Sequence, residues 1–189
     1  MEVKGVAVKS IQLFVEKKYP ERYNNWLNSL SEKSKFIMSG RIIDGAWYDM
    51  HEAAVEPTDK ICKLFYNGSE RGAWESGRYS AEVGLKGIYS FFIKIISPEF
   101  LISRASNIIA TYWRPCEIKV EKTGKNIAFL NITKFGEPNN LMEQRIGGWI
   151  EKALELCGCK NLNITITKSL ANGDKLTEYK AKWDQDSEA

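Results

Sequence analysis

Residues 142–183 read MEQRIGGWIEKALELCGCKNLNITITKSLANGDKLTEYKAKW and hold the clearest secondary-structure pattern in the chain. Between Met142 and Cys157 the apolar or small positions recur at helical spacing, which predicts a helix that buries one face. These positions are Ile146, Trp149, Ile150, Ala153, Leu154 and Cys157. Gly158 predicts the end of this helix, because glycine readily adopts the positive φ of a helix terminus.

A hairpin is predicted directly after the helix. Residues 162–166 alternate Leu and Ile with Asn and Thr, which is the period of a half-buried strand. Asn172-Gly173 is a dipeptide favoured in two-residue hairpin turns. The return strand places on one face Thr177, Tyr179, Ala181 and Trp183. The last third of the chain is therefore predicted to be a helix followed by a hairpin.

The preceding residues predict helices first and a second hairpin after them. Residues 44–54 are expected to form one of these helices, with Asp44 as its N-cap. Pro115 marks the switch from helical to alternating patterns, and two strands are expected up to Phe135. The predicted fold class is α+β, with an N-terminal helical part packed on a small antiparallel sheet that is made of two C-terminal hairpins with a helix between them.

We expect one domain over 1–189. It comprises a helical part at about 1–114, a hairpin-helix-hairpin part at about 115–184 and a short disordered tail at 185–189. Within the helical part, residues 69–96 carry glycine and alanine at intervals of three and four. Such a face permits close approach of a helix or a ligand, and we favour helix–helix contact.

Composition and charge restrict the classes of partner that the protein is expected to bind and the cellular compartment in which it is expected to work. The 189 residues are 43% hydrophobic, and 27 basic residues stand against 24 acidic ones. The net charge of +3 is spread along the chain, so we expect no nucleic-acid partner. We also expect no membrane span and no secretory leader. Four cysteines without zinc-site spacing indicate free thiols and a cytoplasmic protein.

Four motifs, spread over most of the chain, together carry a family resemblance. They are Lys4-Gly5-Val6 through Phe14-Val15 with Tyr19 and Trp26; Gly77-Arg78-Tyr79 with Ala81 and Leu85-Lys86-Gly87; Tyr112-Trp113-Arg114-Pro115; and Arg145-Ile146-Gly147-Gly148-Trp149. In this order they resemble the superfamily of haem-nitric-oxide-binding, 4-vinyl-reductase-type and TRAPP-subunit ligand-binding domains, nearest its non-haem bacterial members. The resemblance implies a pocket between the helical part and the sheet.

The residues that hold haem in that family are not matched here. The family's iron takes an axial histidine from a central helix, whereas the one histidine of this chain, His51, precedes the glycine-rich segment. The family's propionate clamp of tyrosine, serine and arginine falls at residues 131–135, which read NITKF. The sequence therefore predicts no cofactor and argues against haem.

The implied pocket has candidate lining residues of aromatic and basic type. They are Trp47, Trp74, Arg78, Tyr79, Tyr89, Phe92, Arg104, Tyr112 and Trp113. The aromatic rings would hold an apolar or aromatic small molecule, and Arg78 or Arg104 would pair with a carboxylate on it. Each aromatic residue taken singly is also typical of a hydrophobic core, and Arg78 is spaced to pair with Glu75 or Glu82.

Three function classes follow, and an enzyme is the least favoured of them. No catalytic residue or metal ligand is predicted, because the chain lacks a nucleophile motif, a phosphate loop and a set of histidines. The favoured function is a non-haem small-molecule-binding or sensory domain that signals through contact with a protein partner. The alternative is a structural interaction module or homodimer with a filled core. A sensor should have a cavity of a few hundred Å³ (about 300 or more), and an interaction module an exposed apolar patch.

Overall fold

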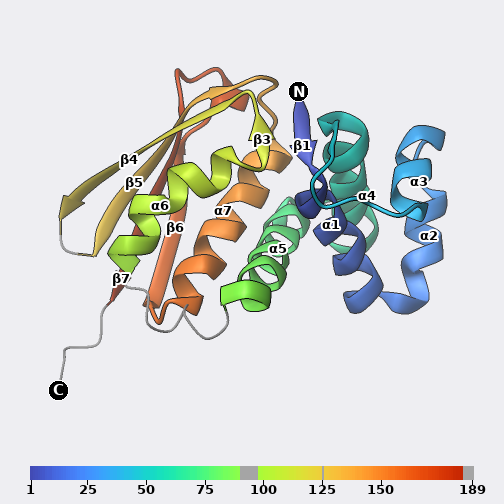
Figure 1. Cartoon of the computed structure of the whole chain (residues 1–189), viewed down its shortest axis with the longest axis horizontal. Coiled ribbons are helices and arrows are strands. Elements are labelled where there is room, and N and C mark those ends of the chain that lie inside the picture. Colours follow the sequence, from blue (N-terminus) through green and yellow to red (C-terminus); the bar gives the residue numbers. More distant parts are fainter. Residues whose placement is uncertain (90–97, 125, 185–189) are drawn as a thin grey trace.

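The computed structural model describes residues 1–89, 98–124 and 126–184, and it places helices beside two antiparallel sheets (Figure 1). In chain order the elements are β1 (Glu2–Lys4), α1 (Gly5–Lys18), the 3-10 turn η1 (Pro20–Arg22), α2 (Tyr23–Asn28), α3 (Glu32–Ser39), β2 (Trp47–Asp49), the π-helical turn η2 (His51–Val55), α4 (Glu56–Phe65), α5 (Arg71–Tyr89), α6 (Pro98–Ala110), β3 (Trp113–Arg114), β4 (Cys116–Gly124), β5 (Ile127–Phe135), α7 (Asn140–Leu156), β6 (Lys160–Lys168), the 3-10 turn η3 (Leu170–Asn172) and β7 (Thr177–Asp184). The predicted tail at 185–189 lies outside the described residues.

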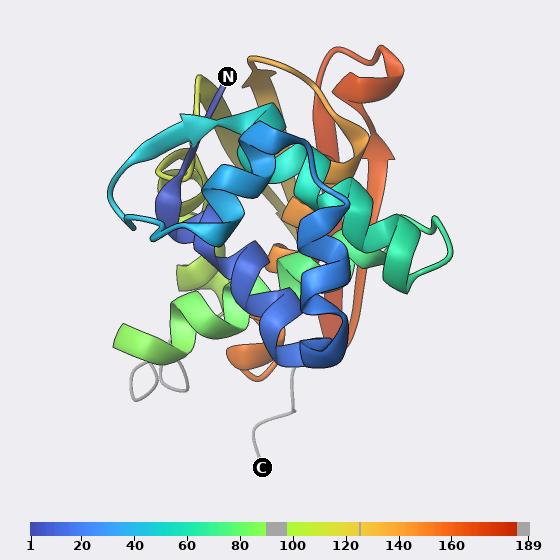
Figure 2. The same ribbon diagram turned by 90° about the vertical axis from the view of Figure 1, so that its right-hand side faces the viewer.

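The elements form layers around α5 and α7. These two helices lie side by side, with the larger sheet on one side and α1 to α4 on the other (Figure 1). Helix α6 packs against β4, and α7 packs against β6 and β7. Figure 2 shows the N-terminal helices, coloured blue to cyan, in front of the C-terminal sheet. The α+β class is therefore confirmed.

The larger sheet contains the two predicted hairpins, with α7 between them in sequence. Its strand order is β4-β5-β7-β6, and all neighbours are antiparallel. Along β7 the buried positions alternate, as predicted, and Tyr179 and Ala181 are fully buried opposite Leu130 and Ala128 of β5. The β6–β7 connection is longer than the predicted two-residue turn, because η3 intervenes before Gly173, whose φ is +91°.

A second sheet of three short strands lies in the N-terminal part and was not predicted. Strand β1 lies between β2 and β3, with Val3 opposite Tyr48 on one side and Trp113 on the other. The helix predicted over 44–54 is wrong for its first half, since β2 occupies residues 47–49. Strands of two or three residues are too short to show an alternating pattern, so only the pairing reveals them.

Glycines allow α5 and α7 to cross at close range. A Cβ atom added at Gly77 of α5 would lie 1.9 Å from the carbonyl oxygen of Arg145. On α7, a Cβ atom at Gly148 would lie 2.0 Å from the carbonyl oxygen of Trp74, and one at Gly147 would lie 2.5 Å from its ring. Backbone therefore packs on backbone, which confirms helix–helix contact as the role of Gly77.

The carboxylate of Glu143 on α7 holds the β6–β7 connection in place. Glu143 is 3% exposed. It accepts hydrogen bonds from the Ser169 hydroxyl at 2.6 Å, the Ala171 amide at 3.2 Å and the Thr177 hydroxyl. The Tyr179 hydroxyl donates to the backbone oxygen of Glu143 at 3.0 Å. A buried carboxylate is thus surrounded by donors, as burial of such a group requires.

Gly77→Ala should destabilise the protein by about 1–3 kcal/mol or more, because the new methyl group would force the α5 and α7 backbones apart. Gly84→Ala is the matched control on the same helix, since nothing lies within 4 Å of its Cβ position. That control should be neutral or stabilising by up to about 1 kcal/mol. Urea unfolding followed by circular dichroism measures both changes; equal effects of the two variants would contradict this account of the crossing.

Glu143→Ala should lower the free energy of unfolding by about 3 kcal/mol, because buried donors around it would lose their acceptor. Glu143→Gln keeps the shape and one acceptor oxygen, so its loss should be smaller. Both variants are compared by thermal unfolding. If Glu143→Ala melted at the wild-type temperature, Glu143 would not be the anchor of the β6–β7 connection.

Candidate functional site

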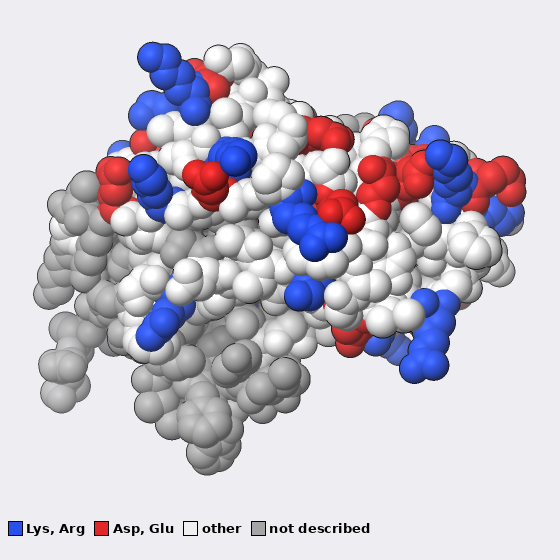
Figure 3. Space-filling view, turned by 45° about the horizontal axis from the view of Figure 1, so that its top comes forward, with Lys and Arg blue, Asp and Glu red and all other residues white. Residues whose placement is uncertain are grey.

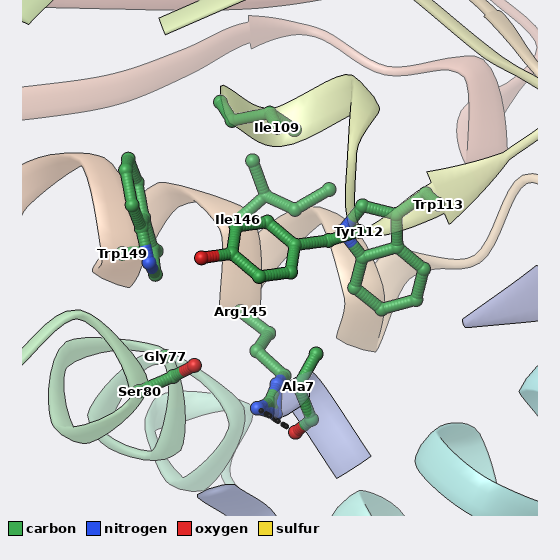
Figure 4. Close-up of a pocket in the computed structure, with 9 residues that line it drawn as sticks. All are labelled: Ala7, Gly77, Ser80, Ile109, Tyr112, Trp113, Arg145, Ile146 and Trp149. Carbon is green, nitrogen blue, oxygen red and sulfur yellow. Dashed lines mark hydrogen bonds between the residues drawn. The ribbon is translucent and has the colours of Figure 1, made fainter. Parts of the chain in front are cut away.

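A small pocket lies where α1, α5, α6, β3 and α7 meet (Figure 4). Its volume is about 30 Å³, which is room for about two water molecules. The lining residues are Ala7, Gly77, Ser80, Ile109, Tyr112, Trp113, Arg145, Ile146 and Trp149. The pocket therefore combines an aromatic and aliphatic wall with a single charged side chain.

Arg145 supplies that charge from α7. Its side chain is 3% exposed and extends to the first turns of α1. One terminal nitrogen, Nη2, donates to the backbone oxygen of Ala7 at 3.0 Å and to the Ser10 hydroxyl at 2.7 Å, and Nη1 lies 3.4 Å from the Ser76 hydroxyl. All three acceptors are neutral. Burial lowers the pKa of Arg145 to about 9, so the group is still a cation at pH 7.

Tyr112 and Trp113 are the two predicted site residues that the structure brings to this pocket. Tyr112 lies in the turn after α6 and Trp113 begins β3, so this turn presents both rings at the junction. Trp113 is buried and packs against Phe135, with ring centroids 5.7 Å apart. In Figure 4 the Tyr112 ring lies in the middle of the pocket, between Trp149 and Trp113.

Three predicted residues of α5 do not line the pocket. The Trp74 ring nitrogen donates to Glu151 at 2.7 Å, which ties α5 to α7. Arg78 forms ion pairs with Glu151 and Glu155 of α7. Its guanidinium is thus occupied by the protein's own carboxylates. The Tyr79 ring meets Phe14 of α1 edge to face, with centroids 5.6 Å apart.

The remaining predicted site residues lie elsewhere. Trp47 is on β2, where the cations of Lys4 and Arg114 lie 5.2 Å and 4.1 Å from its ring centroid. Arg104 is exposed on α6 and stacks over Phe100. The side chain of Tyr89 and the whole of Phe92 lie outside the described residues. The predicted cluster of nine is therefore not one site.

Sequence reasoning missed Arg145, Trp149 and Ile146 as pocket residues. All three belong to the helix predicted from residue 142 onward, where Ile146 and Trp149 were assigned to a buried stripe. A signal was present: Arg145 lies three residues after Met142 and one before Ile146, so an arginine interrupts an apolar helix face. A charge at such a position either escapes to solvent or is enclosed with polar partners.

The thiols of Cys62, Cys116 and Cys157 show no sign of nucleophilic activation. Cys62 and Cys159 are buried, and Cys116 and Cys157 are half-buried. Burial raises the pKa of Cys62 and Cys157 to about 11 and that of Cys116 to about 12. Over the residues that the structure covers, no group of three or more metal-ligating side chains comes together.

The described surface and helices bear on the expected absence of a nucleic-acid partner and of a membrane span. Basic and acidic side chains are interspersed on the face shown in Figure 3. Among the described helices, none is both long and apolar enough to cross a bilayer. The absence of a nucleic-acid partner stays a prediction.

Comparison with known proteins shows the fold. Neither a protein-family model nor a curated protein sequence matches the chain. Among solved structures, an H-NOX protein from S. oneidensis in the Fe(II)NO ligation state matches with a TM-score of 0.73 and 13% identity, over 96% of this chain and 99% of that one. The Fe(II) unliganded H-NOX protein from K. algicida matches with a TM-score of 0.70 and 11% identity, over 98% and 99%. A third structure, which concerns the modulation of haem redox potential through protein-induced porphyrin distortion, matches with a TM-score of 0.68 and 11% identity. The match covers 96% of this chain and 99% of that one.

These neighbours share the fold of this chain over 96–98% of its length, and at 11–13% identity they show the fold alone. They also overturn the prediction of no cofactor. Proteins of this fold are described with haem and Fe(II), so the fold points to haem rather than to no cofactor.

The residues in the described part of this chain do not fit haem in the conformation shown. The pocket of about 30 Å³ is far below the ~300–1,000 Å³ of typical cofactor and ligand sites. His51, the one histidine in the sequence, is exposed at the start of η2 and does not line the pocket. Residues 131–135 lie on β5 and do not line it either.

The raised thiol pKa values predict slow alkylation. At pH 8 the native cysteines 62 and 157 should react with iodoacetamide about a hundredfold more slowly than in urea, and Cys116 about a thousandfold more slowly, because each pKa unit lowers the thiolate fraction about tenfold. Mass spectrometry of the labelled peptides measures this for each site. A native cysteine that reacted at the unfolded rate would instead be a candidate nucleophile.

Proposed function

We propose that this chain is a small-molecule-binding sensory domain that signals through contact with a separate protein. The observation that carries the proposal is the pocket at the junction of α1, α5, α6 and α7, which is lined by aromatic and aliphatic side chains together with one buried cation, Arg145. Sites with an apolar lining and a few placed polar groups are typical of small-molecule recognition.

The fold supports this function by analogy. The S. oneidensis neighbour was solved with Fe(II)NO, so a protein of this fold holds a small molecule. The neighbours are 11–14% identical to this chain, which makes the analogy one of architecture.

The pocket also lies where a ligand can act on both halves of the molecule. Arg145 belongs to α7, whereas its partners Ala7 and Ser10 belong to α1. A ligand that competes for the guanidinium would alter the hydrogen bonds that join these helices. A difference in ligand affinity between two arrangements is what shifts a population of conformations.

A structural interaction module is the second candidate, and two observations favour it. The pocket is about 30 Å³, well below the few hundred Å³ (~300 or more) expected of a sensor. Phe36 and Ile43 are 81% and 61% exposed, which offers apolar contacts to a partner. In such a module the pocket residues would serve only as core.

Native mass spectrometry and a visible absorption spectrum of the freshly purified protein separate the two candidates. Both are repeated after incubation with ferrous haem, the group associated with the structural neighbours. For a sensor we expect a bound small molecule at one per chain. A Soret band after incubation would identify that molecule as haem.

His51→Ala is the matched variant for the haem arm. An axial histidine could only be His51, so a histidine-ligated haem would lose its spectrum in this variant. If neither co-purified nor added molecules bind, and a thermal-shift screen of small molecules also gives no response, the sensory proposal is overturned in favour of the interaction module.

A further inference from the structure

The larger sheet has two edge strands, β4 and β6, and they differ in charge. On β4 the exposed side chains of Glu117, Lys119 and Glu121 alternate in sign along the edge. On β6 the exposed side chains between the two terminal lysines are Asn and Thr, and residues 161–167 carry no charge. Charges on an edge strand are a common device against pairing with another chain. The uncharged middle of β6 is therefore open to a further strand.

The backbone of β6 is paired on one side only, as far as the structure describes the chain. Its partner is β7, from Lys160 opposite Asp184 to Lys168 opposite Glu178. Figure 2 shows β6 at the right-hand margin of the sheet. Backbone N–H and C=O groups that point out from such an edge can pair with an added strand, and these main-chain hydrogen bonds supply affinity.

Two open hollows follow β6 on the side of the sheet that faces the helices. One, of about 370 Å³, is lined by Leu162 and Ile164 of β6 and by Trp74 of α5, among others. The other, of about 270 Å³, is lined by Ile166 and by residues of the β6–β7 connection. Gln144 of α7 borders both hollows. An added strand would point alternate side chains toward this face, so two of them can enter the hollows.

The side-chain amide of Gln144 is available to such a strand. Gln144 is half-buried, and its amide has no hydrogen-bond partner among the residues that the structure describes. A primary amide offers two donors and one acceptor oxygen. Between the two hollows, it can therefore donate to and accept from the polar groups of an extended chain that lies along β6.

The hollow beside Ile166 favours a basic side chain. It is lined by the carboxylates of Glu70 and Asp174, and neither is in an ion pair with a described residue. The one ammonium in this lining belongs to Lys168, which already lies 3.1 Å from a carboxylate oxygen of Glu178. The hollow is therefore net acidic, and a complementary cation would select the correct partner.

The hollow beside Leu162 favours an apolar side chain. The charges in its lining are paired within the chain, Arg71 with Glu75 and Glu151 with Arg78. The Trp74 ring and the aliphatic side chains of β6 remain as its apolar walls. Covering such walls with an apolar group removes them from water.

The spacing of the hollows fixes the spacing of the two side chains. Residues 162–164 line one hollow and residues 166–169 line the other, so their centres are about four residues, or ~13 Å, apart along the strand. Positions four apart on an added strand face the same side, because side chains alternate with a period of two. In an antiparallel strand the basic residue precedes the apolar one.

A peptide segment suits this edge better than a second copy of the chain. The turn over residues 66–70, between α4 and α5, projects beyond β6 in Figure 2, and Glu70 and Arg71 at its end line the hollows. A two-fold axis beside β6 would bring the same turn of a second copy into the same space. An extended peptide carries no such turn and occupies the width of one strand.

We propose that β6 binds an extended segment of a partner protein as an antiparallel fifth strand. A basic side chain of the segment lies at Glu70 and Asp174, and an apolar side chain four residues later packs against Trp74. This assignment rests on the proposed signalling through a separate protein and names its contact surface and the chemistry of the partner. It does not involve the pocket around Arg145.

Fluorescence anisotropy with the labelled, end-blocked peptide TKTTTIT tests the assignment. The peptide should bind at one per chain with a dissociation constant of about 1 mM or lower. The charge-reversed peptide TETTTIT should bind at least about tenfold more weakly, because it places a carboxylate beside two others. Hydrogen exchange locates the contact: TKTTTIT should slow the amides of residues 160–168 and leave those of the β4 edge unchanged.

Glu70→Lys should weaken binding of TKTTTIT at least about tenfold and strengthen binding of TETTTIT, because it reverses one charge of the acidic hollow. Glu117→Lys is the matched control, since it makes the same change on the opposite edge of the sheet and should alter neither affinity. Gln144→Leu should weaken both peptides about threefold or more through the lost amide. Should Glu70→Lys not fold, Glu70→Gln should narrow the difference between the two peptides.

The assignment would be overturned if TKTTTIT did not bind, if it did not protect residues 160–168, or if Glu70→Lys and Glu117→Lys had equal effects. A dimer in analytical ultracentrifugation that protected these same residues would assign the edge to a second copy and would overturn it too. These failures leave the small-molecule sensor untouched, because that function is decided by the mass-spectrometric experiment. Failure of the sensor would likewise leave the β6 contact standing as that of an interaction module.

Discussion

The close crossing of α5 and α7 is the constraint on which the rest of this structure depends. At Gly77 and Gly148 one helix presents bare backbone to the other, and a Cβ atom at either site would lie 1.9–2.0 Å from a carbonyl oxygen. The helices that pack on α5 and the sheet that packs on α7 are joined through this contact. Its cost is the helix propensity of glycine, about 1 kcal/mol per residue relative to alanine, which the packing has to offset.

The same crossing decides the environment of the charges on α7. Glu151 and Glu155 lie at its partly exposed edge and meet Arg78 there. Arg145 lies on the side that faces α1, where it is buried and its hydrogen-bond partners are neutral. Glu143 points toward the β6–β7 connection and is fully surrounded by donors. One helix thus carries a surface ion pair, a structural carboxylate and an enclosed cation, and only their surroundings distinguish them.

Much of the fold could be predicted, and about a quarter of the candidate site. Of the nine predicted lining residues the structure brings Tyr112 and Trp113 to one pocket, because the turn out of α6 presents both rings there. Trp74 and Arg78 were not separable from them by residue type, since an aromatic or basic residue at helical spacing suits a core, an ion pair or a ligand equally well. Their partners on α7 are more than seventy residues away in the chain. Contacts of that kind leave no mark on local periodicity.

By itself the sequence determined what depends on neighbouring residues. The period of residues 142–183 specified a helix and alternating strands, because burial of one face imposes 3.6- and 2-residue repeats on the choice of side chains. The tertiary structure alone decided what depends on distant residues: the three-stranded sheet around Val3, the backbone contact at Gly77 and the enclosure of Arg145. The physical reason is that the desolvation of a side chain, and how closely other atoms approach it, depend on every element around it. The residues next to Arg145 in the sequence form only one of those elements, helix α7.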